Sequence, residues 1–189
     1  MNPDLMPAPS VDDSSPYFLR EINLLDAGFI QKLTQTPGWL QYIGSRGTET
    51  TEGTYTYIQR AYTEAYAQHG YGLWGIILRG NQIPIGVCGL VNRSGTPAPD
   101  LGFALLPSYE GQGWVIQASK VVLAYATTHL KLKRVDAYAN EDNVRSRKTL
   151  ERLGFSLLQC SFQEAFGAII CHYSRMENDH TETVYDPIE

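Results

Sequence analysis

The stretch from residue 100 to residue 129 limits most strongly what this chain can fold into. Residues 100–106 form an apolar run typical of a strand, which Pro107 closes. Gly111 and Gly113 follow, and residues 112–129 repeat apolar side chains at the spacing of an amphipathic helix. The first amides of a helix lack intrahelical partners and carry the positive end of its dipole. A glycine-rich turn at that point therefore suits a bound anion such as a pyrophosphate.

Phosphate-binding motifs with a fixed sequence do not fit this turn. The P-loop requires a lysine after its glycines, and none follows here. Ile116 stands where the dinucleotide fingerprint GxGxxG has its third glycine. Two glycines are equally typical of a tight strand-to-helix turn that binds nothing, so both interpretations stay open at this point.

The rest of the chain is a patterned region between two ends of different composition. Residues 1–16 hold four prolines, and residues 177–189 are acidic, so we expect tails there and one domain over residues 17–176. The expected strands cover residues 17–22, 73–79, 83–91, 100–106, 134–140, 155–164 and 168–175. The expected helices cover residues 52–68, 112–129 and 144–153, and a further helix begins at Asp26, which is expected to cap it. Strands that cluster early and then alternate with helices indicate an α+β, or mixed α/β, fold.

Composition argues against several classes of protein. Fifteen Lys and Arg against twenty Asp and Glu give a net charge of −5, without the broad basic surface of a nucleic-acid-binding protein. No apolar run approaches the length of about 18 residues that indicates a membrane span, and the start of the chain does not resemble a secretory signal. Three cysteines without CxxC spacing indicate reduced thiols in the cytoplasm. Four scattered histidines predict no metal site.

A second informative segment is residues 140–155, NEDNVRSRKTLERLGF. Asn143 is placed to cap a helix that Gly154 ends. Ser146 shares the inward stripe of that helix, so its hydroxyl either bonds a carbonyl one turn back or faces a cleft. Residues 131–152 carry seven Lys and Arg against four Asp and Glu, a local charge of +3 that suits either a small polyanion or a solvated helix face.

Together these segments resemble the GNAT acetyltransferase superfamily, and more narrowly its RimJ/RimL-like branch of ribosomal-protein N-terminal acetyltransferases. The family loop, R/Q-x-x-G-x-G/A, corresponds to residues 110–115, EGQGWV. The branch's ending, NxxSxxxLxxxGF, is matched by Asn143, Ser146, Leu150, Gly154 and Phe155. Residues 86–90 (GVCGL) and 100–107 (DLGFALLP) match its third and fourth strands, and the resemblance covers about residues 17–175.

The resemblance implies a GNAT-like fold: a central, mostly antiparallel twisted sheet of about seven strands, about four helices, and a splay between strands four and five. It implies an N-acetyltransferase that moves an acetyl group from acetyl-CoA to a primary amine by direct attack on the thioester. The amine would belong to a protein N-terminus or to a small molecule. The implied cofactor-binding residues are Phe103, Ala104, Leu105, Leu106, Gly111, Gln112, Gly113, Trp114, Val115, Asn143 and Ser146.

Such chemistry needs groups that handle protons. Ser146 is the candidate donor to the leaving thiolate. Asp100, which opens the fourth strand, and Asp136, which shares one face of the fifth with Tyr138, are the candidate bases, although each carboxylate is equally well explained as an exposed or salt-bridged acid. Cys88 lies in an apolar strand and is expected to be a core residue.

Departures from the family pattern lead to a second hypothesis. Glu110 stands where Arg or Gln is usual, Val115 where a small residue is usual, and Gln117 where glutamate is frequent. A non-catalytic acyl-CoA sensor on the same fold is therefore the alternative, and an enzyme that transfers longer acyl groups is a third hypothesis.

Exposed faces of the terminal hairpin would be compatible with a homodimer. The aromatic residues of the early helices would either line the acceptor side or belong to the core: Trp39, Tyr42, Tyr55, Tyr57 and Tyr62.

Overall fold

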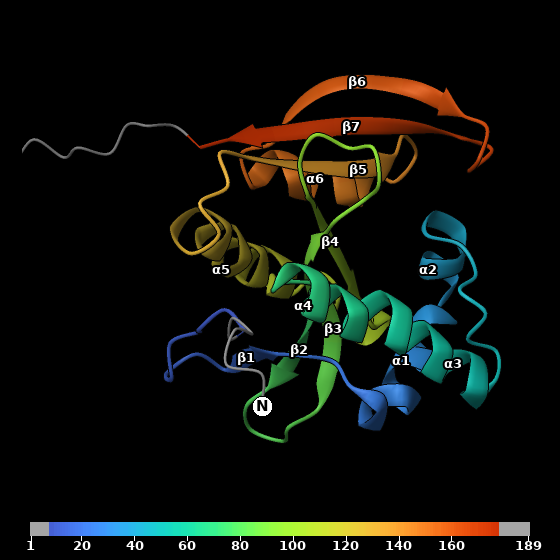
Figure 1. Cartoon of the computed structure of the whole chain (residues 1–189), viewed down its shortest axis with the longest axis vertical. Helices are drawn as coiled ribbons and strands as arrows, with labels where there is room; N and C mark the ends of the chain where they lie inside the picture. The colour runs from blue at the N-terminus through green and yellow to red at the C-terminus, as the bar shows by residue number, and fades with distance from the viewer. Residues whose placement is uncertain (1–7, 178–189) are drawn as a thin grey trace, which may run out of the picture.

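The computed structural model describes residues 8–177, which form one seven-stranded sheet with helices on both faces (Figure 1). The strands are β1 (Tyr17–Arg20), β2 (Leu73–Leu78), β3 (Pro84–Val91), β4 (Asp100–Leu105), β5 (Arg134–Asn140), β6 (Ser156–Gln163) and β7 (Ala168–Met176). Their order is β1-β2-β3-β4-β5-β7-β6, and every neighbouring pair is antiparallel except β4–β5. The predicted mixed α+β sheet is therefore confirmed.

The sheet opens between β4 and β5. These two parallel strands share a single register pair, Asp100 with Asp136. On its other side, β4 pairs with β3 along all six residues of β4. Beyond that pair β4 continues without β5 beside it, and its burial changes from buried at Leu101 to half-buried from Gly102 to Leu105. The two strands thus form a V that is closed at Asp100 and Asp136, as the family resemblance implies.

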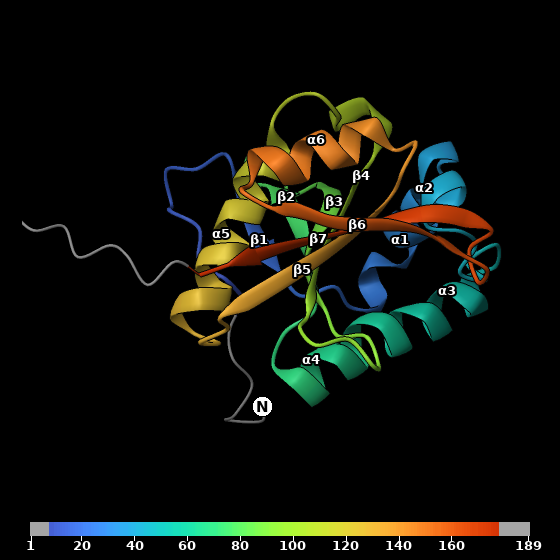
Figure 2. The same cartoon turned by 90° about the horizontal axis from the view of Figure 1, so that it is seen from above.

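Helices cover the sheet in two groups, which Figure 2 shows from above. The described helices are α1 (Ala27–Thr34), α2 (Pro37–Tyr42), α3 (Thr51–Ile58), α4 (Glu64–His69), α5 (Trp114–Thr128) and α6 (Val144–Arg152). Helix α5 packs on β3 and β4, and α6 packs on β5 and β6. A π-helical segment, Gln59–Thr63, joins α3 to α4, so these two form the single long helix that the sequence predicts. The sequence reading had no counterpart for α2, whose six residues are too few to show a helical period.

The main core lies between α5 and the first strands. Trp74 on β2 packs edge-on against Tyr125 of α5, with ring centroids 5.5 Å apart. Cys88 is fully buried on β3, where its sulfur lies 3.4 Å from the Ser119 hydroxyl, so its expected place in the core is confirmed. Of the aromatic residues in the early helices, Trp39 and Tyr62 are buried. Tyr42, Tyr55 and Tyr57 keep part of their surface accessible.

The predicted cap of the first helix is wrong by one turn. Asn23, not Asp26, accepts the hydrogen bond of a capping residue, from the amide of Leu25. Asp26 instead accepts a hydrogen bond from the Asn23 amide. It also forms a bidentate ion pair with Arg20, in which both nitrogen–oxygen distances are 2.7 Å. A short 3₁₀ turn, Leu24–Asp26, precedes α1, and its own capping box uses the carboxylate that the sequence assigned to the helix.

Part of the segment that precedes β1 packs against the domain. Pro9 is buried, and Ala8 and Val11 pack against the core. The amide of Arg79 donates to the carbonyl of Pro16, which fixes the entry to β1. Residues 1–7 and 178–189, where the remaining parts of both expected tails fall, lie outside the described residues.

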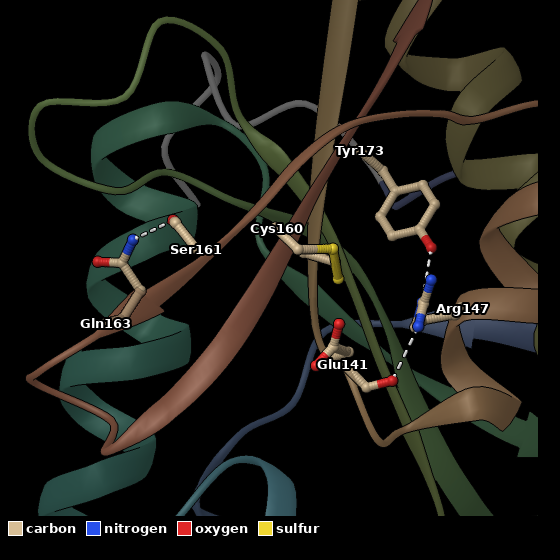
Figure 3. Close-up of a disulfide and its surroundings, with 7 residues drawn as sticks. Glu141, Arg147, Cys160, Ser161, Gln163 and Tyr173 are labelled. Carbon is tan, nitrogen blue, oxygen red and sulfur yellow. Dashed lines mark hydrogen bonds between the residues drawn. A yellow bond between two sulfur atoms is a disulfide. The ribbon is translucent and has the colours of Figure 1, made fainter.

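The expectation that all cysteines are reduced is contradicted, because Cys160 and Cys171 form a disulfide (Figure 3). They lie eleven residues apart on β6 and β7, and the antiparallel register places them directly opposite each other. Nothing in their spacing indicates this, since the pairing follows from where the hairpin turns at Phe166 and Gly167. Cys88 is the free cysteine.

The disulfide predicts a definite count of reactive thiols. Alkylation of the denatured protein without reductant should label Cys88 alone, and the intact mass should lack two hydrogens. Reduction should lower the free energy of unfolding by about 2 to 3 kcal/mol, because it removes the constraint on a short loop of the unfolded chain. Labelling of all three cysteines in freshly purified, unreduced protein would contradict the pairing.

Candidate active site

The turn that follows β4 exposes the first amides of α5. Gly111 and Gly113 have φ of +74° and +84°, a left-handed backbone that glycine adopts without strain. A Cβ built on Gly111 would meet no atom within 4 Å, so the space over this turn is open. The side chain of Gln112 braces the turn, since its Nε2 donates to the Ser108 carbonyl and its Oε1 accepts from the Trp114 indole. These features place uncovered N–H groups and the positive end of a fifteen-residue helix at the open end of the V.

Glu110, the acidic residue at the start of this turn, is neutralised by a partner from another element. It forms an ion pair with Arg145 of α6, whose guanidinium is otherwise largely exposed. The pair connects the turn on the β4 side of the V to the helix on the β5 side. It therefore removes an unpaired negative charge from beside the candidate phosphate position.

Helix α6 begins at the side of the V opposite to the turn. Asn143 caps it as predicted, since its Oδ1 accepts from the amide of Ser146 at 3.1 Å. The Ser146 side chain is half-buried, and within residues 8–177 no hydrogen bond of its hydroxyl is recorded. Thr149 on the same helix behaves differently, because its hydroxyl donates to the Arg145 carbonyl at 2.9 Å. Among the described residues, the Ser146 hydroxyl therefore does not donate to a carbonyl one turn back, which was one of its two predicted roles.

At the closed end of the V, both predicted carboxylates are buried and paired with arginines. Arg93 from the β3–β4 loop holds Asp100 through contacts of 2.7 and 3.1 Å, and Arg134 holds Asp136 at 2.6 and 2.9 Å. Burial raises the pKa of Asp100 above its ordinary value, and the hydrogen bond from Arg93 opposes that shift. Burial also works to raise the pKa of Asp136, but hydrogen bonds from Arg134 and His172 lower it overall. The two neighbouring carboxylates thus have pKa values pushed in opposite directions.

The sequence reading missed one member of this cluster, His172 on β7. Its Nε2 lies 2.9 Å from Oδ2 of Asp136, and its ring stacks on Tyr138 with centroids 4.6 Å apart. Register explains the contact, because β5 pairs with β7 so that Tyr138 lies opposite His172. Only the pairing of two distant strands could have indicated this residue, and the sequence gives no signal of that register.

The structure separates the candidate residues into two groups. The turn at residues 110–115 and the start of α6 lie at the open end of the V, whereas Asp100, Asp136 and Tyr138 lie at its closed end. The six residues of β4 connect the two groups over about 20 Å. A ligand with an anionic head and a long arm would reach from one group to the other.

Other features of the surface do not coincide with this site. Two hollows of about 380 and 430 Å³ lie along α1 and α3, and neither includes a residue of the V. Burial raises the pKa of the Cys88 thiol to about 12, which keeps it protonated and unreactive near neutrality. Within residues 8–177, no group of three or more His, Cys, Asp or Glu is placed to hold a metal. No helix of that part is long and apolar enough to cross a bilayer.

The class of protein that this fold and site define is confirmed by comparison with known families. Residues 17–156 match the acetyltransferase (GNAT) domain, and the chain belongs to that family. Its solved structural neighbours include proteins of the RimJ/RimL type. One is RimL, a ribosomal L7/L12 alpha-N-protein acetyltransferase in complex with coenzyme A, with a TM-score of 0.75 and 20% identity over 88% of this chain and 97% of the other. Another is the ribosomal-protein-S5-alanine acetyltransferase of Vibrio fischeri, with a TM-score of 0.74 and 20% identity over 90% of this chain and 98% of the other.

A curated relative by sequence comes from Bacillus subtilis. It is an uncharacterized N-acetyltransferase, YjdG, 29% identical over 89 residues. The match covers 47% of this chain and spans about half, 53%, of the relative's length. The family resemblance drawn from the two glycines and the residue 140–155 motif is thus confirmed.

The ion pair at the closed end of the V predicts a pH-dependent loss of stability. Because the pKa of Asp136 is lowered by folding, its contribution is complete above about pH 4, the ordinary range of an Asp, and is lost as the pH falls through the lower folded value. Asp136→Asn should therefore lower the free energy of unfolding by about 3 kcal/mol at neutral pH, and by less near pH 3. Urea unfolding at both pH values measures this. Asp142→Asn, an exposed carboxyl, is the control, and a deficit of Asp136→Asn that does not change with pH would contradict the assignment.

Proposed function

We propose that this protein is an N-acetyltransferase that moves the acetyl group of acetyl-CoA to a primary amine by direct attack on the thioester. The observation that carries the proposal is the V between β4 and β5, with uncovered helix amides at its open end. Strand β4 presents backbone N–H and C=O groups to the gap over the residues that β5 does not pair. Such groups need partners, and the amides of a pantetheine arm supply them.

Acetyl-CoA would bind as the substrate along β4. Its diphosphate would accept hydrogen bonds from the amides at the start of α5, and its arm would run along β4 toward Asp100. Asn143 and Ser146 would contact the arm from the β5 side. The proposed binding residues are Phe103, Ala104, Leu105, Leu106, Gly111, Gln112, Gly113, Trp114, Val115, Asn143 and Ser146.

The proton transfers are assigned to groups on both sides of the V. The Ser146 hydroxyl, which has no recorded partner within the described residues, would donate to the leaving thiolate. Asp100, Asp136 and Tyr138 at the closed end are the candidates for the proton of the amine. No covalent intermediate on the enzyme is needed, since the amine attacks the thioester itself.

The amine would enter from the face of β5 that carries Asp136, Tyr138 and Asn140. The amide of Asn140 donates to the Tyr42 carbonyl at 3.3 Å, which places α2 at the edge of this face. The two acceptor classes are a protein N-terminus, which RimL acts on as an alpha-N-protein acetyltransferase, and a small amine. Neither a nucleic acid nor a membrane is among the proposed partners.

We expect the protein to act in the cytoplasm, a compartment in which disulfides such as Cys160–Cys171 are uncommon. A homodimer would form through the terminal hairpin, whose outer strand β6 is exposed and carries no charged residue.

One experiment separates the enzyme from a sensor on the same fold. Calorimetry with acetyl-CoA measures binding, and release of the coenzyme A thiol measures transfer to a panel of peptides with free N-termini and of primary alkylamines. The proposal expects both. Binding without turnover on the whole panel would favour the non-catalytic acyl-CoA sensor, and co-purification of a longer acyl-CoA would indicate a different acyl group.

Gly113→Asp should abolish binding of acetyl-CoA, because it places a carboxylate beside the diphosphate and strains a residue with φ of +84°. Calorimetry measures the loss. Gly167→Asp is the matched control, since Gly167 has φ of +59° and open space around it, but lies in the β6–β7 turn. Equal affinity in Gly113→Asp and the control would mean that the turn does not hold the diphosphate.

Ser146→Ala should lower kcat by about 100-fold and weaken the binding of acetyl-CoA by much less, because the hydroxyl acts on the leaving group. Thr149→Ala removes another hydroxyl from the same helix and should not change kcat. Steady-state kinetics of both variants with calorimetry of the same samples tests this. Unchanged turnover in Ser146→Ala would exclude the serine from the reaction.

A further inference from the structure

Asp136, His172 and Tyr138 form a connected group at the closed end of the V. Asp136 is completely buried, and it is ion-paired to Arg134 through both carboxylate oxygens. Its Oδ2 also meets Nε2 of His172, whose side chain keeps 18% of its surface exposed. The buried carboxylate thus holds one nitrogen of a ring that still reaches solvent.

The hydrogen bond to Asp136 fixes which nitrogen of the ring is basic. An ionised carboxylate only accepts hydrogen bonds, so Nε2 must carry the proton and donate it. Nδ1 then has the free lone pair, and within residues 8–177 no hydrogen bond to it is recorded. Stacking on Tyr138 fixes the ring plane.

Strand register places this ring one strand away from the opening of the V, across β5. Asp100 and Asp136 are the last paired residues of β4 and β5, and Tyr138 lies two residues further along β5, where β4 is no longer beside it. His172 lies opposite Tyr138 on β7. By strand alternation, Asp136, Tyr138 and Asn140 share one face, and Asn140 connects that face to α2. Tyr173, the neighbour of His172, points the other way, toward Arg147 of α6.

We infer that His172, oriented by Asp136, is the group that takes the proton of the incoming amine, an assignment that rests on the proposed acetyl transfer. An imidazole accepts protons near neutral pH, whereas both carboxylates of the cluster are already occupied by arginines. Asp136 is the positioning residue, and His172 touches the amine directly or through one water.

The step balances without a further reactant. The ammonium of the acceptor loses one proton to Nδ1, which later releases it to solvent. The neutral nitrogen bonds the acetyl carbon as the carbon–sulfur bond breaks. The leaving thiolate takes the proton of the Ser146 hydroxyl, and the second proton of the amine restores that hydroxyl. The products are the amide, free coenzyme A and one proton.

The charges around the ring come from several elements. Arg134, Asp136 and Tyr138 lie on β5, Asp100 on β4, and Arg93 in the β3–β4 loop, where its guanidinium lies over the Tyr138 ring. On β6 the residue opposite His172 is Gln159, which is uncharged. Within each Asp–Arg pair the two opposite charges cancel. The imidazole is therefore the group of this cluster that gains charge during the reaction.

The test compares pH profiles of kcat/KM for acetyl transfer to the best acceptor in the peptide and alkylamine panel. The wild type should show an acidic limb. His172→Gln, whose amide still donates to Asp136, should lose that limb and about 100-fold in kcat, while its affinity for acetyl-CoA stays unchanged. His129→Gln, at the exposed end of α5, should match the wild type. Asp136→Asn should lower kcat without abolishing the binding of acetyl-CoA, because it removes the acceptor that orients the imidazole.

Outcomes separate the inference from the function on which it rests. Turnover by the wild type with an unaltered profile in His172→Gln overturns the role of His172 alone. Binding of acetyl-CoA by the wild type without turnover on any acceptor overturns both. Should His172→Gln not fold, carbethoxylation of the wild type decides, because inactivation should follow modification of His172. Full activity after complete modification of that residue would exclude it.

Discussion

The loss of one strand partner is the constraint on which the rest of this structure depends. Beyond Asp100, β4 has β3 on one side and a gap on the other. A row of its backbone N–H and C=O groups therefore faces that gap rather than another strand. A sheet does not leave such groups without partners in its middle unless a ligand or water takes that place. The turn at Gly111 and Gly113 and the cap at Asn143 lie on the two arms of this opening.

Charge at the closed end of the opening is balanced locally. Asp100 and Asp136 sit side by side at the only register pair of β4 and β5, where two unpaired carboxylates would repel each other. Arg93 and Arg134 offset them from different elements, which also connects the β3–β4 loop to the sheet. The other two side chains of that cluster, His172 and Tyr138, are not part of an Asp–Arg pair, and both are half-buried.

Local patterns in the sequence were enough for most of the fold. The strand that ends at Pro107, the two glycines with left-handed backbone and the cap at Asn143 each depend on neighbours within a few residues, and the structure confirms them. The features that were missed all depend on register between distant segments. The disulfide of Cys160 and Cys171, the ion pair of Glu110 with Arg145, and the contact of His172 with Asp136 arise only when separate strands and helices meet. Asp26 was misassigned because Arg20, six residues earlier, competes for its carboxylate.

The most direct measurement of the central claim is a crystal structure of the full chain grown with acetyl-CoA. The account predicts a diphosphate within hydrogen-bond distance of the amides of Gly113, Trp114 and Val115, and a pantetheine arm paired with β4 between Gly102 and Leu105. The thioester should then lie between the Ser146 hydroxyl and the pair formed by Asp136 and His172. Coenzyme A bound elsewhere on the protein, with the opening between β4 and β5 filled by side chains, would contradict it.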